Sequence, residues 1–363
     1  APSLLPVSQG PRLIVYHQTH HLSNGDPVSL LPLITNNTGI THVIVAALHL
    51  NDGPGNITLN NDPPSHNKFD QLWGEVRWLQ GAGVRVLLML GGAAQGTYER
   101  LCGDNASFEA YYQPLLSILR TYNFNGIDLD IEEPVTHLPI RRLILRLHQD
   151  MGDSFLITLA PVATALTPDP KIPIIMPVFG LLPSLRHLSG DKFSYFVLES
   201  DPELKRIISW YNVQFYCGWG DASRTTHYDT IIRAGWDPSR VVMGVVTNAE
   251  NGAGHVPPER LSEVITTLRQ TYPDFGGVMG WEYFNAGLES KEGNGPWEWV
   301  GKIGKAARMV SPAASVPIGP KPNMWKEEDV QWLIEMGADR GKAEGALEAA
   351  DGNVEVAAGL LFE

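Results

Sequence analysis

Cysteines, long apolar runs and positive charges are all scarce in this sequence. The chain has 363 residues but only two cysteines, so at most one internal disulfide bond can form. The longest apolar candidate, 172–185, is interrupted by prolines and is too short to cross a bilayer. Lys and Arg number 27 against 40 Asp and Glu, a formal charge of −13, which argues against nucleic acid or an anionic membrane as a partner.

The two cysteines and three glycosylation sequons bear on the compartment. Cys102 and Cys217 are either one bridge or two unrelated small buried residues, because so wide a spacing does not reveal geometry. The sequence starts at Ala1 without a basic, apolar leader, so a secretory signal has either been removed or never existed. Secretion is the expectation, and it is compatible with three sequons, at Asn36, Asn56 and Asn105.

An acidic stretch, 122–134, is the most informative part of the sequence. If 126–132 is a strand, alternation sends Asp128, Asp130 and Glu132 to one face and the large aliphatic residues to the other. A solvated acidic turn would not need these aliphatic residues, whereas a strand covered by helices on one face and open to a site on the other does. The alternation therefore favours a functional site over a merely acidic strand.

Short apolar segments recur along the chain, each followed by an amphipathic stretch such as 69–81, 108–121, 258–271 or 297–309. The predicted strands are 12–17, 42–50, 84–91, 126–132, 155–161, 210–217, 241–247 and 276–281. Eight such units predict the α/β fold class and a (β/α)8 TIM barrel, in which the chemistry lies at the carboxyl ends of the strands.

The residues at these strand ends are acidic, aromatic or amide-bearing, with some glycines. They are Tyr16, His17, Gly91, Gly92, Glu132, Pro161, Gln214, Tyr216, Asn248, Trp281 and Glu282. Any single tyrosine or tryptophan is more often a core residue. Their convergence at one end of a barrel favours a sugar site instead, because aromatic faces pack under sugar rings while carboxyls and amides bind the hydroxyls.

The chain is predicted to consist of three parts. They are a catalytic domain at 1–309, which holds the barrel, a Pro-rich linker at 310–323 and a small domain at 324–363. Inside the barrel, the Pro-rich insertion 164–188 has no periodicity and is predicted to cover the site. The small domain carries four Lys or Arg against ten Asp or Glu from Lys321 onward. It is predicted to be an all-α bundle of three helices, 326–336, 340–350 and 353–362. Its predicted core is Trp332, Leu333, Met336, Ala346, Leu347, Val354, Ala357 and Leu360.

Glu132 is the best candidate for a general acid, because it ends its strand where a leaving group could reach it. Three inward carboxyls two residues apart cannot all ionise cheaply, so at least one pKa should be raised. No second carboxyl stands out as a nucleophile. This gap is explained if the substrate supplies its own nucleophile, the acetamido oxygen of an N-acetylglucosamine.

The stretch 125–132 resembles the DxxDxDxE signature of glycoside hydrolase family 18, with Asn125 in place of the first Asp. Further matching segments are Leu-Gly-Gly at 90–92, Leu-Ala-Pro at 159–161, Gln-Phe-Tyr at 214–216 and Gly-Trp-Glu-Tyr-Phe-Asn at 280–285. Within this family the chain is most similar to fungal secreted endo-β-N-acetylglucosaminidases, on the segments 12–16 and 277–284. Those enzymes cut between the two core N-acetylglucosamines of N-glycans.

The resemblance implies a role for each matching residue. Glu132 is the acid/base, Asp130 orients the attacking acetamido group, and Asp128 holds Asp130 in place. Tyr216 hydrogen-bonds the acetamide carbonyl, Gln214 lies beside it, and Trp281 forms the floor of the sugar site. The other predicted substrate-binding residues are Tyr16, Asn248, Glu282, Gly91 and Gly92. No metal site and no cofactor is expected, because the pair His20 and His21 lacks the ligands that would accompany it.

The segment 324–363 resembles a ubiquitin-associated (UBA) domain, on Met336-Gly337, Ala346-Leu347 and the run 352–355. The resemblance implies a ubiquitin-like partner. Ala338 stands where that family has an aromatic residue that helps to hold ubiquitin, so the loss of apolar contact area weakens this expectation. A helical cap that packs on the barrel or a dimer mate is the alternative. A working UBA-like domain would instead favour an intracellular location.

The leading hypothesis is therefore a retaining endoglycosidase that acts on N-glycans through an oxazoline. A chitinase acting on chitin oligomers is the runner-up within the enzyme class. The alternatives from other classes are a non-catalytic family-18-like lectin and a UBA-mediated interaction protein. The lectin is disfavoured by the presence of Glu132, which such proteins commonly lose.

Overall fold

A computed structural model describes residues 10–168, 187–288, 295–308 and 326–350, together with 353, 354, 357, 358 and 361. Its strands are β1 (Arg12–His17), β2 (His42–Leu50), β3 (Ile57–Leu59), β4 (Arg85–Gly91), β5 (Gly126–Asp130), β6 (Leu156–Leu159), β7 (Ile208–Gln214), β8 (Val241–Val246) and β9 (Gly277–Trp281). Its α-helices are α1 (Pro32–Thr35), α2 (Asp70–Gly81), α3 (Asn105–Thr121), α4 (His137–Met151), α5 (Tyr195–Ser200), α6 (Pro202–Ile207), α7 (Thr226–Arg233), α8 (Pro258–Thr271), α9 (Trp297–Arg308), α10 (Glu327–Glu335) and α11 (Arg340–Ala349).

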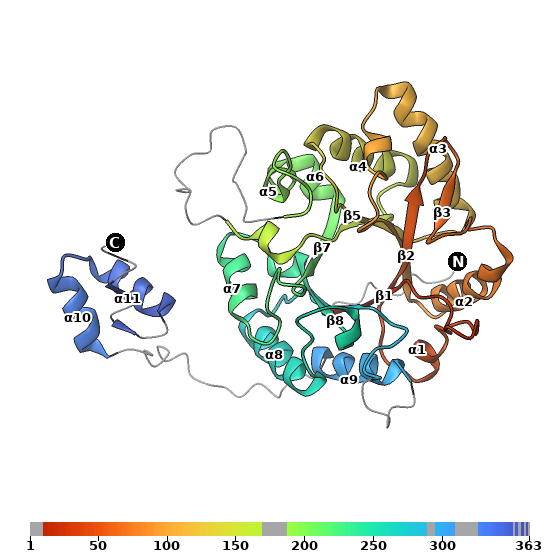
Figure 1. Ribbon diagram of the computed structural model, residues 1–363. Coiled ribbons are helices and arrows are strands. Elements are labelled where there is room, and N and C mark those ends of the chain that lie inside the picture. The colour runs from red at the N-terminus through yellow and green to blue at the C-terminus, as the bar shows by residue number, and fades with distance from the viewer. Residues whose placement is uncertain are drawn as a thin grey trace. The chain divides into compact units, whose positions relative to one another are not determined.

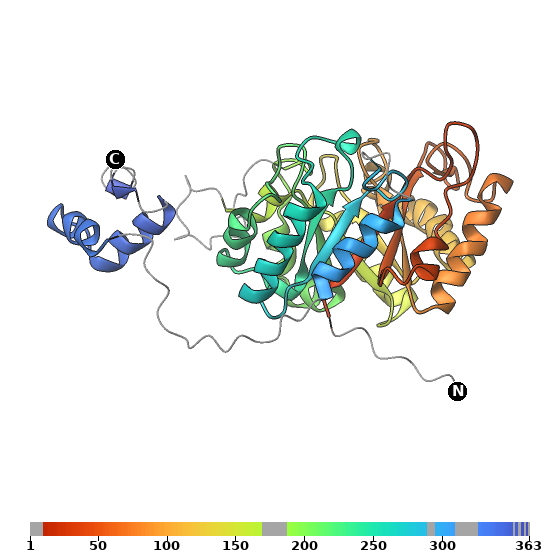
Figure 2. The ribbon, with the colours of Figure 1, turned by 90° about the horizontal axis from the view of Figure 1, so that it is seen from below.

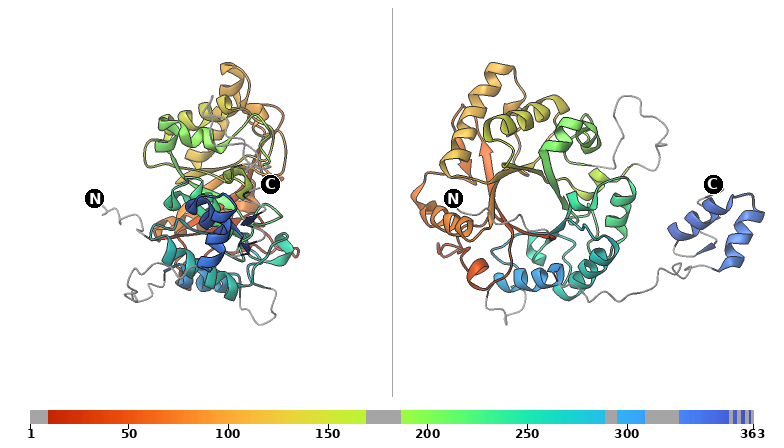
Figure 3. Two further views of the ribbon diagram at one scale, coloured as in Figure 1. Left: turned by 90° about the vertical axis from the view of Figure 1, so that its left-hand side faces the viewer. Right: turned by 180° about the vertical axis from the view of Figure 1, so that it is seen from behind.

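Eight parallel strands close into a barrel. The order of strands is β1-β9-β8-β7-β6-β5-β4-β2, and β1 pairs with β2 to complete the ring. Helices surround this ring, as seen from one end in Figure 1 and from the other in the right panel of Figure 3. Figure 2 shows the helices lying alongside the strands. The prediction of a (β/α)8 barrel is confirmed, with each of the eight predicted strands at its place.

Besides shifts of one or two residues at the ends of β4, β6, β8 and β9, the observed strands differ from the predicted ones in three ways. The three-residue strand β3 was missed, because it is too short to show alternation; it pairs antiparallel with β2 outside the ring. β7 begins two residues early and ends at Gln214, so Phe215, Tyr216 and Cys217 follow it. β5 ends at Asp130, which places Glu132 on the loop beyond the strand. Asp128 and Asp130 are therefore held by a strand, whereas Glu132 is held by the loop that follows it.

Alternation along the strands divides the barrel's apolar residues into two cores. On β5, Ile127 and Leu129 belong to the large core beneath the helices. Residues of the other parity, such as Ile14 and Tyr16 on β1, form a smaller core inside the ring. Asp128 has the inward parity and hydrogen-bonds to Tyr16, so the acids share the interior with this second core.

The chain divides into two compact units, Ala1–Met309 and Val310–Glu363. In the second unit, α10 and α11 pack through Val330, Leu333 and Leu347, which are buried. Trp332 and Met336 were predicted in this core, but they are 44% and 46% exposed. The prediction was wrong because Val330 and Leu333, three residues apart, already form the inward face of α10, and Trp332 lies outside that face.

Three predicted segments lie wholly or partly outside the described residues. They are most of the insertion 164–188, the linker 310–323 and much of the third tail helix 353–362. The described part of the insertion begins with a short 3₁₀ helix, Ala163–Leu166. The described tail residues at 354, 357, 358 and 361 are helical. No helix in the described part of the chain is both long and apolar enough to span a bilayer.

The two cysteines do not pair. Both Cys102 and Cys217 are free and exposed, so neither the bridge nor the pair of buried residues that the sequence allowed is found. Cys102 lies in the loop between β4 and α3, where its thiol donates to the carbonyl of Tyr98 at 3.2 Å, and Cys217 follows β7. Each cysteine belongs to a different loop.

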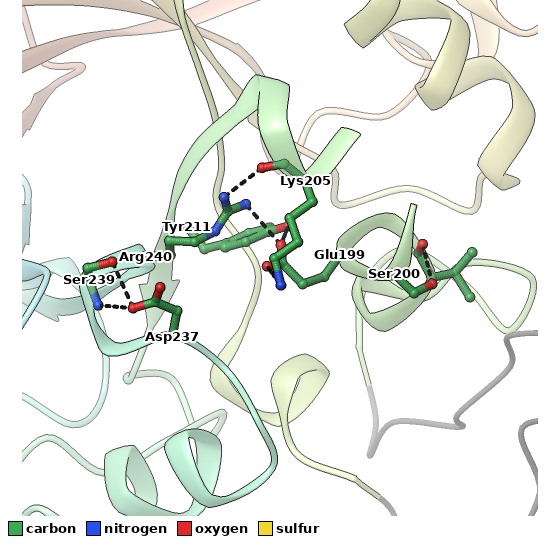
Figure 4. A network of polar contacts seen from close by, with 8 residues as sticks. Glu199, Ser200, Lys205, Tyr211, Asp237, Ser239 and Arg240 are labelled. Carbon is green, nitrogen blue, oxygen red and sulfur yellow. Dashed lines mark hydrogen bonds and ion pairs between the residues drawn. The ribbon is translucent and has the colours of Figure 1, made fainter. Parts of the chain in front are cut away.

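A polar network joins α5 to β7 and to the short 3₁₀ helix Pro238–Arg240, which precedes β8 (Figure 4). The carboxylate of Glu199 accepts hydrogen bonds from Arg240 at 2.9 Å and from the hydroxyl of Tyr211 at 2.8 Å. Arg240 also donates to the carbonyl of Lys205 at 2.7 Å. The side chains of Glu199 and Arg240 are each only 15% exposed. Removal of one partner would therefore leave the other charge buried.

The substitution Glu199→Ala is expected to lower the free energy of unfolding by about 3 kcal/mol, the usual cost of leaving a buried charge unpaired. Glu203→Ala is the matched control, because Glu203 pairs with Arg141 at a side-chain exposure of 51%. It should cost at most about 1 kcal/mol. Urea denaturation of both variants measures the difference, and equal losses would show that the buried pair contributes no more than a surface pair.

Candidate active site

Strand β5 places Asp128 and Asp130 inside the barrel. Asp128 is fully buried and Asp130 is 6% exposed, whereas Glu132, on the loop that follows, is only partly buried. Asp130 is paired in register with Gly91 on β4, which places it at the carboxyl end of both strands. The three acids therefore rise in order from the interior of the barrel to its open end, as the alternation predicts.

Asp128 is held by three side chains from three other strands. Its carboxylate accepts hydrogen bonds from Tyr16 at 2.6 Å, Thr158 at 2.5 Å and Asn212 at 2.9 Å. Burial raises its pKa, and these hydrogen bonds oppose that effect. These three donors fix the position of the Asp128 carboxyl beneath Asp130.

Asp130 and Glu132 share one hydrogen-bond donor, the side-chain amide of Gln214. Its nitrogen lies 3.3 Å from Asp130 Oδ1, 3.4 Å from Glu132 Oε1 and 2.9 Å from the carbonyl of Ala160. Burial, Glu132 and Asp128 raise the pKa of Asp130 well above its ordinary value. Burial also raises the pKa of Glu132, against the hydrogen bond from Gln214. Both carboxyls therefore favour their protonated forms more than they would in water.

Two glycines at the end of β4 bring the backbone against these acids. Gly91 and Gly92 both have φ of +94°. A Cβ on Gly91 would lie 2.5 Å from the carbonyl oxygen of Asp130, and the N–H of Gly92 donates to that oxygen at 2.9 Å. Side chains at these positions would be strained by both the torsion and the contact. The glycines thus position Asp130 through its backbone.

Three aromatic residues lie around the acids. The rings of Tyr16 and Trp281 have centroids 5.3 Å apart, and Tyr16 also binds Asp128. Tyr216 is buried beside Asp130 and Glu132, which together with burial raise the pKa of its hydroxyl well above the ordinary value. That hydroxyl makes no hydrogen bond to any described residue, so it is a neutral donor available to a ligand.

Two residues of the predicted set are engaged in holding loops. The carboxylate of Glu282 accepts the backbone N–H groups of Gln18 at 2.9 Å and Thr19 at 2.8 Å, and also the Thr19 hydroxyl. Asn248 caps the short helix Ala249–Asn251 and donates to the carbonyl of Asn285 at 2.9 Å. Their place at the strand ends is as predicted, but the polar groups expected for substrate are used within the protein.

Sequence reasoning missed four residues that hold the acids. Thr158 and Asn212 bind Asp128, and Trp210 donates to Asn212 at 2.9 Å. The parity of β7 could have revealed Trp210 and Asn212, because they alternate toward the interior with Gln214. The fourth, Glu133, is buried and accepts the backbone N–H groups of Gly96 at 2.9 Å and Tyr98 at 2.7 Å. No sequence pattern distinguishes it from a solvated neighbour of Glu132.

The comparisons with known proteins agree with this arrangement. The family model "Glycosyl hydrolases family 18" matches residues 12–305. The chain belongs to glycosyl hydrolase family 18. Within the described residues of this hydrolase, no three His, Cys, Asp or Glu side chains come together as a metal ion would require.

Two solved structures resemble the hydrolase over most of its length. A chitinase from Aspergillus fumigatus is 49% identical with a TM-score of 0.69, and the match covers 81% of this chain and 98% of that one. A fungal endo-β-N-acetylglucosaminidase of family 18 is 41% identical with a TM-score of 0.72, covering 82% and 98%. The comparisons thus support a family 18 hydrolase similar to both classes of enzyme.

The curated relatives match shorter parts. "Chitinase 2" of Rhizopus oligosporus is 25% identical over 243 residues, which are 60% of the hydrolase and 38% of that protein. "DNA damage-inducible protein 1" of Cryptococcus neoformans is 55% identical over 49 residues, 14% of the hydrolase and 11% of that protein. The hydrolase therefore spans well under half the length of these curated relatives.

The substitution Glu133→Ala should destabilise the family 18 barrel while leaving Asp128, Asp130 and Glu132 in place. It would leave the N–H groups of Gly96 and Tyr98 without an acceptor in a buried site, at a cost of about 2–4 kcal/mol. Glu133→Gln keeps one acceptor oxygen and should recover part of that loss. Denaturation with urea measures both, and an unchanged midpoint for Glu133→Ala would contradict the role of Glu133 as a clamp on this loop.

Proposed function

We propose that this hydrolase is a retaining endo-β-N-acetylglucosaminidase that cleaves the β-1,4 bond between the two core N-acetylglucosamines of N-glycans. The observation that carries the reaction type is the inventory of carboxylates at the open end of the barrel. Asp128, Glu133 and Glu282 have their oxygens engaged by other protein groups. Among the described residues considered for the site, this leaves Asp130 and Glu132.

Only one of these two carboxyls is suited to reach a leaving group. Glu132 lies beyond the strand and is partly exposed, while Asp130 is nearly buried beneath it. A retaining enzyme with two carboxyls would need the second as a nucleophile at the anomeric carbon. Because Asp130 is too deeply placed for that, the acetamido oxygen of the substrate is the nucleophile. This requires an N-acetylated sugar at the cut.

The mechanism follows from these positions. Glu132, whose pKa is raised by burial, donates its proton to the glycosidic oxygen as the bond to the anomeric carbon breaks. The substrate's acetamido oxygen attacks that carbon and forms an oxazoline. Asp130 stabilises the positive charge that develops on the acetamido nitrogen, and the hydroxyl of Tyr216 donates to the acetamido oxygen. Glu132 then deprotonates the water that opens the oxazoline, with retention at the anomeric carbon.

Trp281 and Tyr16 complete this proposal. The ring of Trp281, which is partly exposed and packs against the buried ring of Tyr16, makes an apolar floor for the ring of the sugar that is cut. Asp128 lies beneath Asp130, and its carboxyl adds to the effect of burial and of Glu132 in raising the pKa of Asp130. The side-chain amide of Gln214 donates hydrogen bonds to both Asp130 and Glu132. Gly91 and Gly92 allow the β4 backbone to lie against Asp130.

A chitinase is the second candidate, since the 49% identical structure is a chitinase. The mechanism is the same for both, and only the sugars beyond the cut differ. The mass of the sugar released from a glycoprotein of known glycans, compared with the products from a chitin oligomer, separates the two. Cleavage of the chitin oligomer alone would overturn the assignment to N-glycans.

We propose that ubiquitin is a partner of the second unit. We also propose that the protein is secreted, so that the barrel can reach its substrate. The support for the partner is an exposed pair, Trp332 on α10 and Met336 at the C-cap of that helix, directly before Gly337. Titration of the full chain with labelled ubiquitin tests it, with Trp332→Ala as the variant that should abolish the shifts. Ala338 replaces the aromatic residue of the UBA pattern, so binding should be weak.

A further inference from the structure

A separate cleft of about 630 Å³ opens at the same end of the barrel as the acids. Its walls come from the loop after β1, the end of β2, the β3 hairpin, the residues just before α2 and the loop after β4. None of the three acids lines it. Its volume lies within the range of roughly 300–1,000 Å³ typical of small-molecule sites.

The cleft begins next to the catalytic loop. Gln95 lines it and donates from its side-chain nitrogen to the carbonyl of Glu132 at 2.9 Å. Another wall contains Gln18 and Thr19, which follow β1, the strand that carries Tyr16. The carboxylate of Glu282 accepts their backbone N–H groups. The two loops that flank the acids are therefore also two walls of the cleft.

The lining is polar but carries no acid. Among the described residues around the cleft none is Asp or Glu, although the chain has a formal charge of −13. The one lysine, Lys68, is paired with Asp62. Phe69, the only Phe, Tyr or Trp in the described lining, is 1% exposed and lies under the ammonium of Lys68. The cleft therefore offers neither a free charge nor a flat aromatic platform.

Three amide or imidazole side chains of this lining are unused by the fold. Gln18, His49 and Asn61 make no side-chain hydrogen bond to any described residue. His49 has an unpartnered Nδ1, and burial lowers the pKa of its ring, so the ring is neutral and can both donate and accept. Other polar residues of the cleft hold its frame: Asn60 bridges the backbones of Gln18 and Ala47, and Asn51 binds Thr58.

We propose that this cleft binds the unacetylated hexose arm, the branching mannoses, of the N-glycan that is cut. The inference rests on the proposed function. Hexose hydroxyls both donate and accept hydrogen bonds, as do the two amides and the neutral imidazole that the fold leaves free. A linear chitin chain would instead be expected to lie on aromatic rings, which pack under the apolar faces of its sugars.

The test compares two substrates with one triple variant, Gln18→Ala/His49→Ala/Asn61→Ala. The first substrate is a glycopeptide with five or more mannoses, and the second is a glycopeptide that ends at the core N-acetylglucosamine disaccharide. The variant should lose roughly 10- to 100-fold in kcat/KM on the first, as expected for two or three lost hydrogen bonds. On the second it should change less than twofold, since no arm is present.

Each other outcome overturns the inference. An equal loss on both substrates would mean that the three residues support the catalytic loop, and no loss on the first would mean that the arm lies elsewhere. Gln149→Ala is the control, because Gln149 lines a surface groove between α3 and α4. If the triple variant does not fold, Asn61→Ala alone, at an exposed turn without side-chain partners, should still reduce kcat/KM on the first substrate by at least about threefold.

A binding measurement separates this inference from the proposed function. Calorimetric titration of the Glu132→Gln protein with an oligomannose that contains no N-acetylglucosamine should show binding that the triple substitution abolishes. If the wild-type enzyme fails to cut any glycopeptide but this binding is found, the proposed function is wrong and the cleft's ligand is right. Absence of binding, with cleavage intact, overturns the cleft alone.

Discussion

Glu132→Gln should lower kcat on an N-acetylglucosamine-containing substrate by about 10²- to 10⁴-fold, the usual contribution of a general acid. The amide keeps the size of the side chain and can remain beside Gln214 Nε2, but it has no proton to give to the leaving oxygen. Because binding depends mainly on other groups, KM should change little. Initial rates with a glycopeptide and with a chitin oligomer measure the loss, whichever of the two is the substrate.

The matched control for this substitution is Glu250→Gln. Glu250 follows β8 on the same end of the barrel, is exposed and makes no side-chain hydrogen bond to any described residue. It loses the same charge, yet it should change kcat less than twofold. A Glu132→Gln protein as active as the wild type would show that another group protonates the leaving oxygen, and the proposed mechanism would be wrong.

The barrel and the order of its acids were accessible from the sequence because both depend on local periodicity. Apolar runs recur at barrel spacing, and Asp128, Asp130 and Glu132 are two residues apart on a segment whose other parity is aliphatic. The same rule, applied to β7, would have added Asn212 to the site. Local patterns of this kind are independent of how distant segments meet.

The use of each polar group could not be predicted, because it depends on partners far away in the sequence. Glu282 ends a strand like a binding residue, but Thr19, which binds it, is 263 residues away. Glu133 looks like a second copy of Glu132, and only the fold shows that Gly96 and Tyr98 donate to it. The empty hydrogen-bonding capacity of Gln18, His49 and Asn61 is equally invisible until the loops are placed.

Asp130→Asn should reduce activity and yet stabilise the protein. Asparagine cannot carry the charge that stabilises the acetamido group in the transition state, so kcat should fall by about 100-fold or more. The native barrel, however, holds Asp130 nearly buried between Asp128 and Glu132, an environment in which its ionisation is unfavourable. Removing the ionisable group should therefore raise the free energy of unfolding at neutral pH by on the order of 1 kcal/mol, an activity-for-stability exchange common at active sites.

The pH dependence identifies the source of that gain. The pKa of Asp130 is higher in the native state than its ordinary value of 3.8, so the unfolded chain releases this proton first as the pH rises. The wild type thus loses stability through the window from about pH 4 up to the native pKa, and the variant does not. The difference in unfolding free energy between the two should be near zero below pH 4 and should grow with pH. Asp274→Asn, at an exposed position, should show no such growth, and a gap independent of pH would exclude burial of the Asp130 charge as its cause.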